Sequence, residues 1–313
     1  MNNVYIPFRE EQFDYITTRV VYAKYGSPGI ANQMKCACDT LLYALLTNRT
    51  FQMYTPSAPE FLFIHPFNRT RFEIEKSDNQ TETFDVSRDY FSSFDDFQRI
   101  SVQSQNELPP VEDSVYEGSI LVRAHRVFGH QLLSKKSNKL ILRKLGLPIR
   151  MKSEYWYDLC IPNLFQPSCY LESLIRPYEK KMRNKFVIGV HARLAGNVSE
   201  WGEFISYLSK KGLRMMIQKI KEVAKTHPNY TVFIASDTLS VISLFRSSFK
   251  NVISTSGYTL EHGGRNPSRS GLILSALELF LLSRCDMLLL TKQSQFSSVA
   301  HHLSTRNIPT FYF

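Results

Sequence analysis

The stretch VIGVHARLAGN, residues 187–197, decides how the second half of this chain is interpreted. Apolar residues and one glycine lead into His191 and Arg193, and the apolar pattern then stops. A short apolar run rich in β-branched residues is typical of a strand that is buried on both faces of a parallel sheet. Ligands of open α/β sheets bind outside the carboxyl ends of the strands, so this histidine and arginine indicate a binding edge.

The pattern around this stretch alternates between strands and helices. Strands are predicted at residues 185–190, 230–236, 251–256, 286–291 and 309–313. Helices are predicted at residues 203–227, from a cap at Asp237 or Thr238 onward, at 270–285 and at 294–304. Continuous apolar strands that alternate with helices predict a Rossmann-like domain with a parallel sheet.

The first half is less regular but contains one clear β-α-β unit. Strands are predicted at residues 18–25, 51–55 and 119–125, a helix at 32–47, and a basic helical region that ends near Gly146. Residues 56–114 predict loops with short helices, because they are polar and weakly periodic. A proline-bearing connector at 160–169 and a helix at 171–182 lead into the second half.

The chain is therefore predicted to be α/β, with two Rossmann-like domains, residues 1–165 and 166–313, facing each other across a cleft. We collected the polar residues that follow the predicted strands, because they are the candidates for the binding edge. They are His191 and Arg193, Ser236 and Asp237, residues 255–265, residues 291–298 and, from the first half, residues 26–32.

The composition is that of an ordinary soluble globular protein, with 313 residues, 43% hydrophobic and 21% charged. No window is long and apolar enough for a membrane-spanning helix, and the start resembles neither a signal nor a transit peptide. We therefore expect either a protein that works where it is made, in the cytoplasm, or one whose anchor lies outside this sequence.

Part of the net charge of +10 is concentrated in residues 118–153, which hold nine Lys or Arg residues and no acid. A nucleic-acid or membrane surface, an enzyme that handles phosphorylated donors, or a plain solvated face would each explain this stretch. The sequence leaves these alternatives open.

The five cysteines do not form a metal-binding or disulfide pattern. We expect mostly reduced thiols, although Cys160 and Cys169 are spaced so that they would be able to pair in an oxidising compartment. No paired Asp or His constellation for a metal is evident either.

Two features suggest that a phosphate group binds at the predicted edge. An arginine just beyond a buried strand, here Arg193, is able to hold a phosphate with two parallel hydrogen bonds. The SQFSS stretch at 294–298 opens a helix, whose free N–H groups attract anions, and Ser294 and Ser297 add hydroxyls. Together they predict a diphosphate clamp that needs no metal. The alternatives are a surface salt bridge for the arginine and helix caps for the serines.

Other nucleotide-binding classes lack their motifs here. No G-x-G-x-x-G follows the first strand of the second half, and the chain contains no Walker lysine loop. This argues against a dinucleotide oxidoreductase and a P-loop kinase. A metal-independent transferase that uses a nucleotide-linked donor fits best.

Several blocks, in order along the chain, resemble the superfamily of α1,2-, α1,6- and protein O-fucosyltransferases. The blocks are GSPGIANQMKCACDTLLYALLTNRTF (26–51), VIGVHARLAGN (187–197), YTVFIASD (230–237) and SGLILSALELFLLSRCDMLLLTKQSQFSSVAHHLS (270–304). The resemblance implies a GT-B fold, in which the C-terminal domain binds GDP-fucose. It also implies an inverting, metal-independent glycosyltransferase without a further cofactor, a glycan hydroxyl as acceptor, and no nucleic-acid partner.

The resemblance assigns roles to particular residues. His191 and Arg193 would meet the nucleotide-sugar, with Arg193 on the β-phosphate, and Asn32 would lie near the sugar. Glu278 would hold the guanine edge, unless it is a charge on an exposed helix stripe, and Asp237 would contact the base or ribose, unless it caps a helix. The residues expected to line the diphosphate are Ser294, Gln295, Phe296 and Ser297.

The resemblance leaves the catalytic base and the compartment less defined. Glu200 is the first candidate for the base that deprotonates the acceptor hydroxyl, and Glu203 is the second. Most eukaryotic relatives are Golgi or ER enzymes with an anchor or signal, whereas this sequence fits a bacterial or viral cytoplasmic enzyme. The oligomeric state is not indicated.

The sequence also departs from the family pattern. The α1,2/α1,6 branch has a second arginine and an acid after the HxR strand, whereas residues 194–197 here are LAGN. Linkage, acceptor and donor therefore stay open. The alternatives are a GT-B enzyme that uses UDP-xylose or UDP-galactose, and a carbohydrate- or nucleic-acid-binding protein without turnover.

Overall fold

The structure is a computed structural model of the 313-residue chain. It describes residues 20–25, 29–47, 50–54, 62–64, 98–102, 120–124, 127–194, 207–257 and 268–313. The chain divides into two compact units. Unit 1 comprises Met1–Gly26, Gln33–Glu60 and His65–Gln166, and unit 2 comprises Ser27–Asn32, Phe61–Ile64 and Pro167–Phe313.

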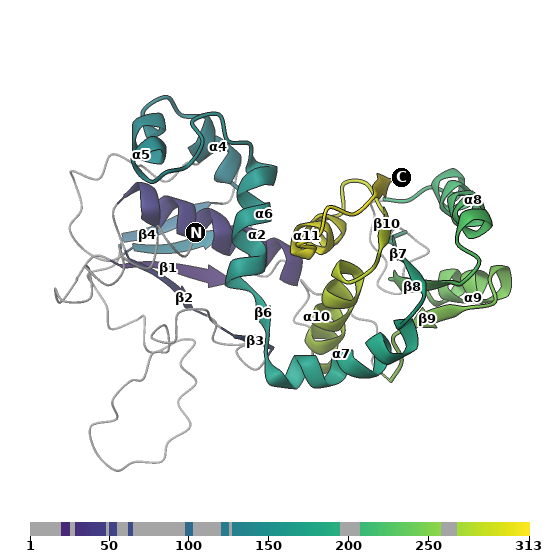
Figure 1. Ribbon diagram of the computed structural model, residues 1–313. Helices are drawn as coiled ribbons and strands as arrows, with labels where there is room; N and C mark the ends of the chain where they lie inside the picture. The colour runs from purple at the N-terminus through teal and green to yellow at the C-terminus, as the bar shows by residue number, and fades with distance from the viewer. Residues whose placement is uncertain are drawn as a thin grey trace, which may run out of the picture. The chain divides into compact units, whose positions relative to one another are not determined.

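Unit 2 is built on a parallel sheet, shown in green and yellow in Figure 1. Its strands are β7 (Phe186–Ala192), β8 (Tyr230–Ser236), β9 (Val252–Ser254), β10 (Met287–Leu290) and β11 (Thr310–Tyr312), in the order β11-β10-β7-β8-β9. Strand β7, which contains the VIGVHA sequence, is the central strand. The predicted α/β class with parallel sheets is confirmed.

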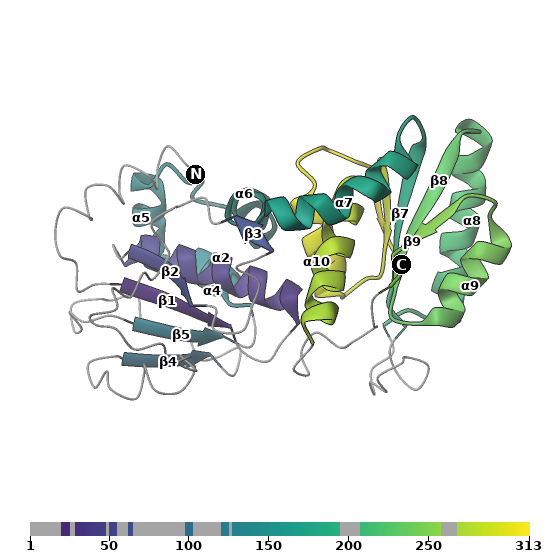
Figure 2. The ribbon, with the colours of Figure 1, turned by 90° about the horizontal axis from the view of Figure 1, so that it is seen from below.

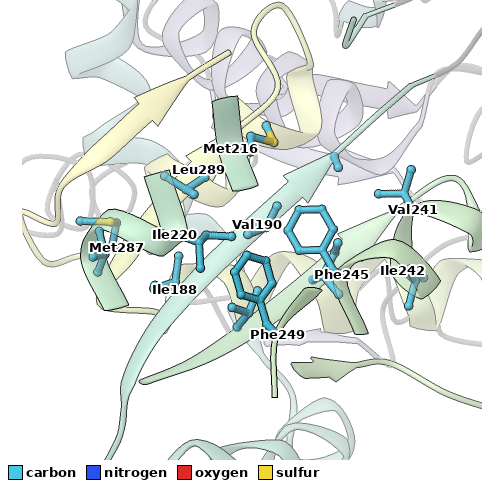
Figure 3. Close-up of a cluster of buried hydrophobic side chains, with 14 of the residues drawn as sticks. Ile188, Val190, Met216, Ile220, Val241, Ile242, Phe245, Phe249, Met287 and Leu289 are labelled. Carbon is cyan, nitrogen blue, oxygen red and sulfur yellow. The ribbon is translucent and has the colours of Figure 1, made fainter. Parts of the chain in front are cut away.

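One face of this sheet is covered by α8 (Lys210–Thr226) and α9 (Leu239–Ser248), both of which are amphipathic. Figure 3 shows the buried cluster that results, with Ile188 and Val190 of β7 among side chains from both helices. Residues two apart on a strand share a face, so Gly189 and His191 face the other side of the sheet. Burial of this cluster away from water is the main stabilisation of this layer.

The remaining helices of unit 2 are α7 (Cys169–Met182), α10 (Arg269–Ser283) and α11 (Gln295–Leu303). Helix α10 is apolar around most of its circumference and contacts α7, α11 and β7, which explains why it is buried along most of its length. A side chain at Gly189 would lie 2.7 Å from the Sγ atom of Cys285 and 2.8 Å from Leu288. The glycine in VIGVHA therefore allows the residues that follow α10 to approach β7 closely.

Unit 1 contains a second parallel sheet, whose strands are seen side by side in Figure 2, with α2 (Ile30–Leu46) alongside. Its strands are β1 (Val20–Tyr25), β2 (Thr50–Tyr54), β4 (Gln98–Val102) and β5 (Ile120–Ala124), in the order β2-β1-β5-β4. Its other helices within the described residues are α4 (Gly129–Ser134), α5 (Asn138–Lys144) and α6 (Ser153–Leu164). Strands β3 (Phe63–Ile64) and β6 (Gln166–Pro167) form a separate short pair.

A buried carboxylate connects three helices of unit 1. Asp39 of α2 is fully buried, and its Oδ2 atom accepts a 2.7 Å hydrogen bond from the N–H of Phe128 before α4. The hydroxyl of Tyr157, in α6, donates to Oδ1 at 2.9 Å. A side chain at Gly129 would collide with this carboxylate. Burial raises the pKa of Asp39 to about 6, against these hydrogen bonds, which lower it.

Three sequence predictions about the elements are wrong. Residues 98–102, expected in a region of loops and short helices, form β4. The expected connector at 160–169 is helical as far as Leu164, because Pro162 lies in the last turn, where it removes only one helical hydrogen bond. The helix expected at 203–227 begins at Lys210, where the Ser209 side chain caps it by accepting from the N–H of Gly212.

All five cysteines are free, which agrees with the expected thiols. No helix among the described residues is long and apolar enough to cross a membrane. The described residues also contain no group of three or more His, Cys, Asp or Glu side chains that would hold a metal ion.

Candidate functional site

The candidate site lies at the carboxyl edge of the sheet in unit 2. Strands β7, β8 and β10 end there, at Ala192, Ser236 and Leu290. Because the strands are parallel and in register, their following residues meet at the same edge. Most of the polar residues predicted from the sequence belong to this edge.

His191 connects the end of β7 to the first turn of α11. Its Nδ1 atom lies 2.7 Å from the Oγ atom of Ser297, and its ring lies 4.7 Å from the ring of Phe296, centroid to centroid. The side chain is 6% exposed. Burial, and then the nearby charge of Arg193, lower the pKa of His191 to about 3. The imidazole is therefore neutral at physiological pH and acts as a hydrogen-bonding group.

Thr291, the first residue after β10, fixes the backbone on both sides of Ala192. Its hydroxyl donates to the carbonyl of His191 at 2.9 Å and accepts from the N–H of Arg193 at 3.0 Å. Its own N–H donates to the same His191 carbonyl at 3.1 Å. These three hydrogen bonds of Thr291 fix the backbone from which the Arg193 side chain extends.

The guanidinium group of Arg193 lies over the ring of Tyr207, with 4.7 Å between Cζ and the ring centroid. The N–H of Tyr207 also donates to the carbonyl of Leu194 at 3.0 Å, so the ring is anchored to the same segment. A cation over an aromatic face is attracted to it and loses part of its conformational freedom. The side chain of Arg193 is therefore oriented at both its ends.

Asp237 holds the residue that follows Arg193. Its Oδ1 atom accepts from the N–H of Leu194 at 3.0 Å and from the hydroxyl of Thr238 at 3.0 Å. Ser236 donates its hydroxyl to the carbonyl of Ala192 at 2.7 Å. The N-cap position of α9 belongs to Thr238, so Asp237 is not the cap, and the Thr238 side chain makes no capping hydrogen bond. Contact of Asp237 with a base or ribose stays a prediction.

Helix α11 begins at this edge with several unused hydrogen-bonding groups. Ser294 is the N-cap, and its hydroxyl accepts from the N–H of Ser297, which confirms the predicted cap. The N–H groups of Gln295 and Phe296 have no acceptor within the part of the chain that the structure describes. The Oε1 atom of Gln295 is buried and has no hydrogen-bond partner there either.

Glu278 is a buried acid in the middle of the apolar helix α10, with 8% of its surface exposed. The interpretation of Glu278 as a charge on an exposed helix stripe is therefore wrong. The hydroxyl of Thr255, which follows β9, donates to its Oε1 atom at 2.6 Å. Burial raises the pKa of Glu278 to about 7, and the hydrogen bond from Thr255 opposes this. A buried carboxyl whose protonation changes near neutral pH is a candidate ligand-binding group.

The structure brings together most, but not all, of the predicted residues. Asn32 lies in the first turn of α2 and is partly buried, and no hydrogen bond joins it to the other candidates among the described residues. Glu200 and Glu203, the candidate bases, lie outside the described residues. The sequence analysis missed Tyr207, because it fell inside the helix expected at 203–227.

The sequence analysis included Thr255 and Thr291 only as members of the ranges 255–265 and 291–298, and it gave neither of them a role of its own. Each is the first polar residue after its strand, at positions where the chain leaves the sheet. That position is the signal that would have identified both of them.

No family model matches the sequence, and no curated protein has a significant sequence match. Solved structures do match the fold. A mutant of Arabidopsis thaliana FUT1 in complex with GDP has a TM-score of 0.63 at 15% identity, over 99% of this chain and 74% of that one. POFUT1 in complex with GDP-fucose has a TM-score of 0.53 at 15% identity, over 94% of this chain and 98% of that one.

Fucosyltransferase NodZ from Bradyrhizobium matches with a TM-score of 0.50 at 17% identity, over 90% of this chain and 92% of that one. At such identities the likeness shows a common arrangement of helices and strands. It does not show which residues of this chain bind a ligand. The chain therefore shares the α/β fold of these solved fucosyltransferase structures.

Proposed function

We propose that this protein is a glycosyltransferase that moves fucose from GDP-fucose to a glycan hydroxyl, with inversion at the anomeric carbon and without a metal ion. Two observations support the donor. The solved structures with this fold include fucosyltransferases in complex with GDP and GDP-fucose. Unit 2 also contains an arginine and a helix N-terminus at the carboxyl edge of its sheet, and a buried acid in α10, which together suit the phosphates and base of GDP.

The observation that carries the proposal is the hydrogen bond between His191 and Ser297. It joins the strand end that bears Arg193 to the first turn of α11, where the N–H groups of Gln295 and Phe296 have no acceptor among the described residues. A guanidinium group and a helix N-terminus both favour anions, and here they belong to one continuous edge. A diphosphate is an anion with enough oxygen atoms to use both.

Arg193 would act on the leaving group. As the glycosidic bond breaks, negative charge develops on the departing diphosphate, and a preoriented cation stabilises that charge. Tyr207 and Thr291 orient Arg193 before the donor arrives. Because the arginine and the helix N-terminus would supply this stabilisation, the transfer step needs no metal ion.

His191 contributes without a charge. Its low pKa keeps it neutral at physiological pH, so it would position Ser297 and the diphosphate edge by hydrogen bonding and by its contact with Phe296. Ser294 would hold the first turn of α11 in place through its cap on the N–H of Ser297.

Glu278 would bind the base of the donor. A carboxylate accepts two parallel hydrogen bonds from the N1–H and N2–H₂ groups of guanine, whereas uracil offers only one comparable N–H group. Thr255 already uses one hydrogen-bonding position of Oε1 and fixes the orientation of the carboxyl group. Asp237 would contact the base or ribose from the neighbouring strand end.

The acceptor side of the proposal depends on other residues. Inversion requires one displacement, in which the acceptor hydroxyl attacks the face of the sugar opposite to GDP. Glu200, or in its place Glu203, would accept the proton of that hydroxyl. Asn32 would lie near the sugar, and the N-terminal domain would bind the acceptor.

A donor screen tests this proposal. The purified chain is offered GDP-fucose, UDP-xylose and UDP-galactose with a mixture of glycans, and nucleotide release is measured together with thermal stabilisation by GDP and UDP. We expect release of GDP from GDP-fucose and stronger stabilisation by GDP. Stronger stabilisation by UDP would contradict the guanine assignment, and binding of GDP without release or transfer from any donor would contradict the enzymatic role.

A further inference from the structure

A strongly basic segment of unit 1 takes no part in the site described above. Residues 129–152 contain seven Lys or Arg residues and no acid. We call these cations, together with the apolar residues Leu140 and Ile149, the basic face. The cations are Lys135, Lys136, Lys139, Arg143, Lys144, Arg150 and Lys152.

The cations of the basic face form no ion pair with an acid in the part of the chain that the structure describes. Surface lysines and arginines are ordinarily mixed with acids, which limits the local electrostatic potential. Seven cations without an acid produce a positive potential that attracts polyanions.

Helix α5 shows how these cations are arranged, and Figure 1 shows it beside α4. Its buried side consists of Asn138 and Leu142. At 100° per residue, the opposite side carries Leu140 with Arg143 and Lys144 on either side of it. Leu140 is 71% exposed, the largest value among the exposed large hydrophobic residues of the described chain.

A second apolar residue of the same kind follows α5. Ile149 is 40% exposed and is directly followed by Arg150. Exposed branched aliphatic side chains gain nothing from contact with phosphates, but they gain from insertion between lipid chains. Lysines and arginines beside them are able to extend their long side chains toward lipid headgroups.

We propose that the basic face is a docking surface for an anionic phospholipid membrane, with Leu140 inserted at the headgroup boundary. The charge complementarity is that of a polybasic segment and anionic headgroups. Nucleic acid would satisfy the same cations, but it offers no apolar layer for Leu140 and Ile149. One or two inserted aliphatic side chains give reversible binding, so the protein would exchange between the membrane surface and water.

This proposal is independent of the donor assignment, because it concerns residues of unit 1 that are not part of the candidate site. An experiment that contradicts the membrane-docking proposal leaves the donor assignment unaffected, and the reverse is also true. If both hold, the enzyme would act on acceptors that are displayed at a membrane surface.

Vesicle co-sedimentation of the full chain tests the proposal. The vesicles contain either phosphatidylcholine alone or phosphatidylcholine mixed with phosphatidylglycerol, at low and at high salt. The charge variant is the triple substitution Lys139→Gln, Arg143→Gln, Lys144→Gln, and the apolar variant is Leu140→Ser. Circular dichroism and thermal unfolding establish that each variant folds.

Matched controls come from exposed helices of unit 2. The triple substitution Lys210→Gln, Lys211→Gln, Arg214→Gln removes the same charge from α8, and Leu239→Ser, at a residue 57% exposed, removes an aliphatic side chain from α9. These controls separate the effect of the basic face from that of total charge and total exposed apolar surface.

We expect binding to the anionic vesicles, weakened by salt, and little binding to phosphatidylcholine alone. Since each cation near an anionic surface is worth roughly a fivefold change in affinity, the charge variant should bind on the order of a hundredfold more weakly. Leu140→Ser should weaken binding roughly tenfold, and the control variants should bind nearly as the unmodified chain.

Three outcomes would overturn the proposal. The first is equal weakening by the charge variant and its α8 control, and the second is no binding to anionic vesicles. The third is tighter binding to duplex or single-stranded nucleic acid that depends on Lys139, Arg143 and Lys144 but not on Leu140. That third result would identify the basic face as a nucleic-acid surface.

Discussion

The Nδ1 atom of His191 lies 2.7 Å from the Oγ atom of Ser297, and this contact joins the central strand of the unit 2 sheet to helix α11. Both groups are buried, so neither has water as a substitute partner. The hydrogen bond therefore matters for stability as well as for the geometry of the proposed diphosphate site.

Ser297→Ala should lower the free energy of unfolding by about 1–3 kcal/mol, because it leaves a buried ring nitrogen without its partner. Urea denaturation monitored by circular dichroism measures this change. Ser247→Ala, at an exposed serine of α9, is the control and should change stability little. Equal stability of Ser297→Ala and the unmodified chain would show that the contact contributes nothing.

The low pKa of His191 predicts a dependence of stability on pH. Between its ordinary value of 6.5 and about 3, the unfolded chain binds a proton that the folded protein does not. The contribution of His191 to the free energy of unfolding is therefore fully present above pH 6.5. It is lost as the pH falls toward 3, by at most about 1.4 kcal/mol per pH unit.

The variant His191→Asn should reduce this acid sensitivity, since asparagine does not titrate. Comparison with the unmodified chain across pH 4–7 isolates the contribution of His191 from those of the carboxyl groups. His130→Asn, at an exposed histidine of α4, serves as the control. Parallel pH profiles for His191→Asn and the unmodified chain would contradict the assignment of a neutral buried imidazole.

Arg193→Ala should reduce the rate of nucleotide release by about 10²–10³ while the protein stays folded, because the charge on the leaving group loses its cation. Arg193→Lys should recover part of the rate, as it keeps the charge but not the two-pronged geometry. Arg214→Ala, in α8, removes an exposed arginine from the same unit and should leave the rate unchanged. Near-normal release by Arg193→Ala would refute the phosphate role.

Tyr207 should act through the orientation of Arg193. Tyr207→Leu removes the aromatic face and should lower the rate of release severalfold, since such contacts contribute roughly 0.5–1 kcal/mol at partly exposed sites. Tyr207→Phe keeps the ring and should restore the rate. If Leu and Phe variants behave alike, the ring has no positioning role, and a fall in thermal stability alone would indicate a purely structural one.

Glu278 should make the binding of GDP depend on pH. Its raised pKa of about 7 means that the folded protein holds a proton between the ordinary value of 4.5 and 7, so its stability falls as the pH rises through that range. The guanine edge requires the ionised form. GDP affinity should therefore rise with pH, by at most about tenfold per unit below pH 7, and then level off.

Glu278→Gln should remove this dependence and weaken GDP binding at pH 8, which isothermal titration calorimetry measures. Glu154→Gln, at an exposed acid of α6, is the matched control. Unchanged affinity for GDP together with unchanged preference over UDP would refute the contact between Glu278 and guanine.

The sequence predicted unit 2 well for a physical reason. A strand buried on both faces, such as YTVFIAS, must be apolar throughout, so it is recognised from its own sequence without knowledge of its neighbours. Strand β8 has the predicted bounds. The carboxyl ends of parallel strands meet at one edge, so the strand ends also located His191, Arg193 and Ser297. The burial of Glu278 was not predictable, since a single acid in a helix has the same pattern whether or not that helix is covered.

Unit 1 was less predictable because its elements depend on distant partners. Strand β4, with the sequence QRISV, has three polar residues and no clear pattern, and it becomes a strand by pairing with β5. Pro162 normally indicates the end of a helix, yet α6 continues to Leu164. Tyr157 and Trp156 of that helix form hydrogen bonds with residues of α2 that lie 118 positions earlier in the sequence. A local sequence pattern cannot predict such distant contacts.

The buried carboxylate of Asp39 has a consequence for the order of folding. Its partners Phe128 and Tyr157 follow it by 89 and 118 residues, so α2 meets them only after most of unit 1 has been synthesised. Until then this acid must stay hydrated, and α2 has no reason to enter a closed core. Contacts of such long sequence separation slow folding, whereas β7 and β8 of unit 2 belong to one short crossover. A nascent chain therefore cannot close the core of unit 1 around Asp39 until Tyr157 has left the ribosome, and α2 stays without these partners over that interval.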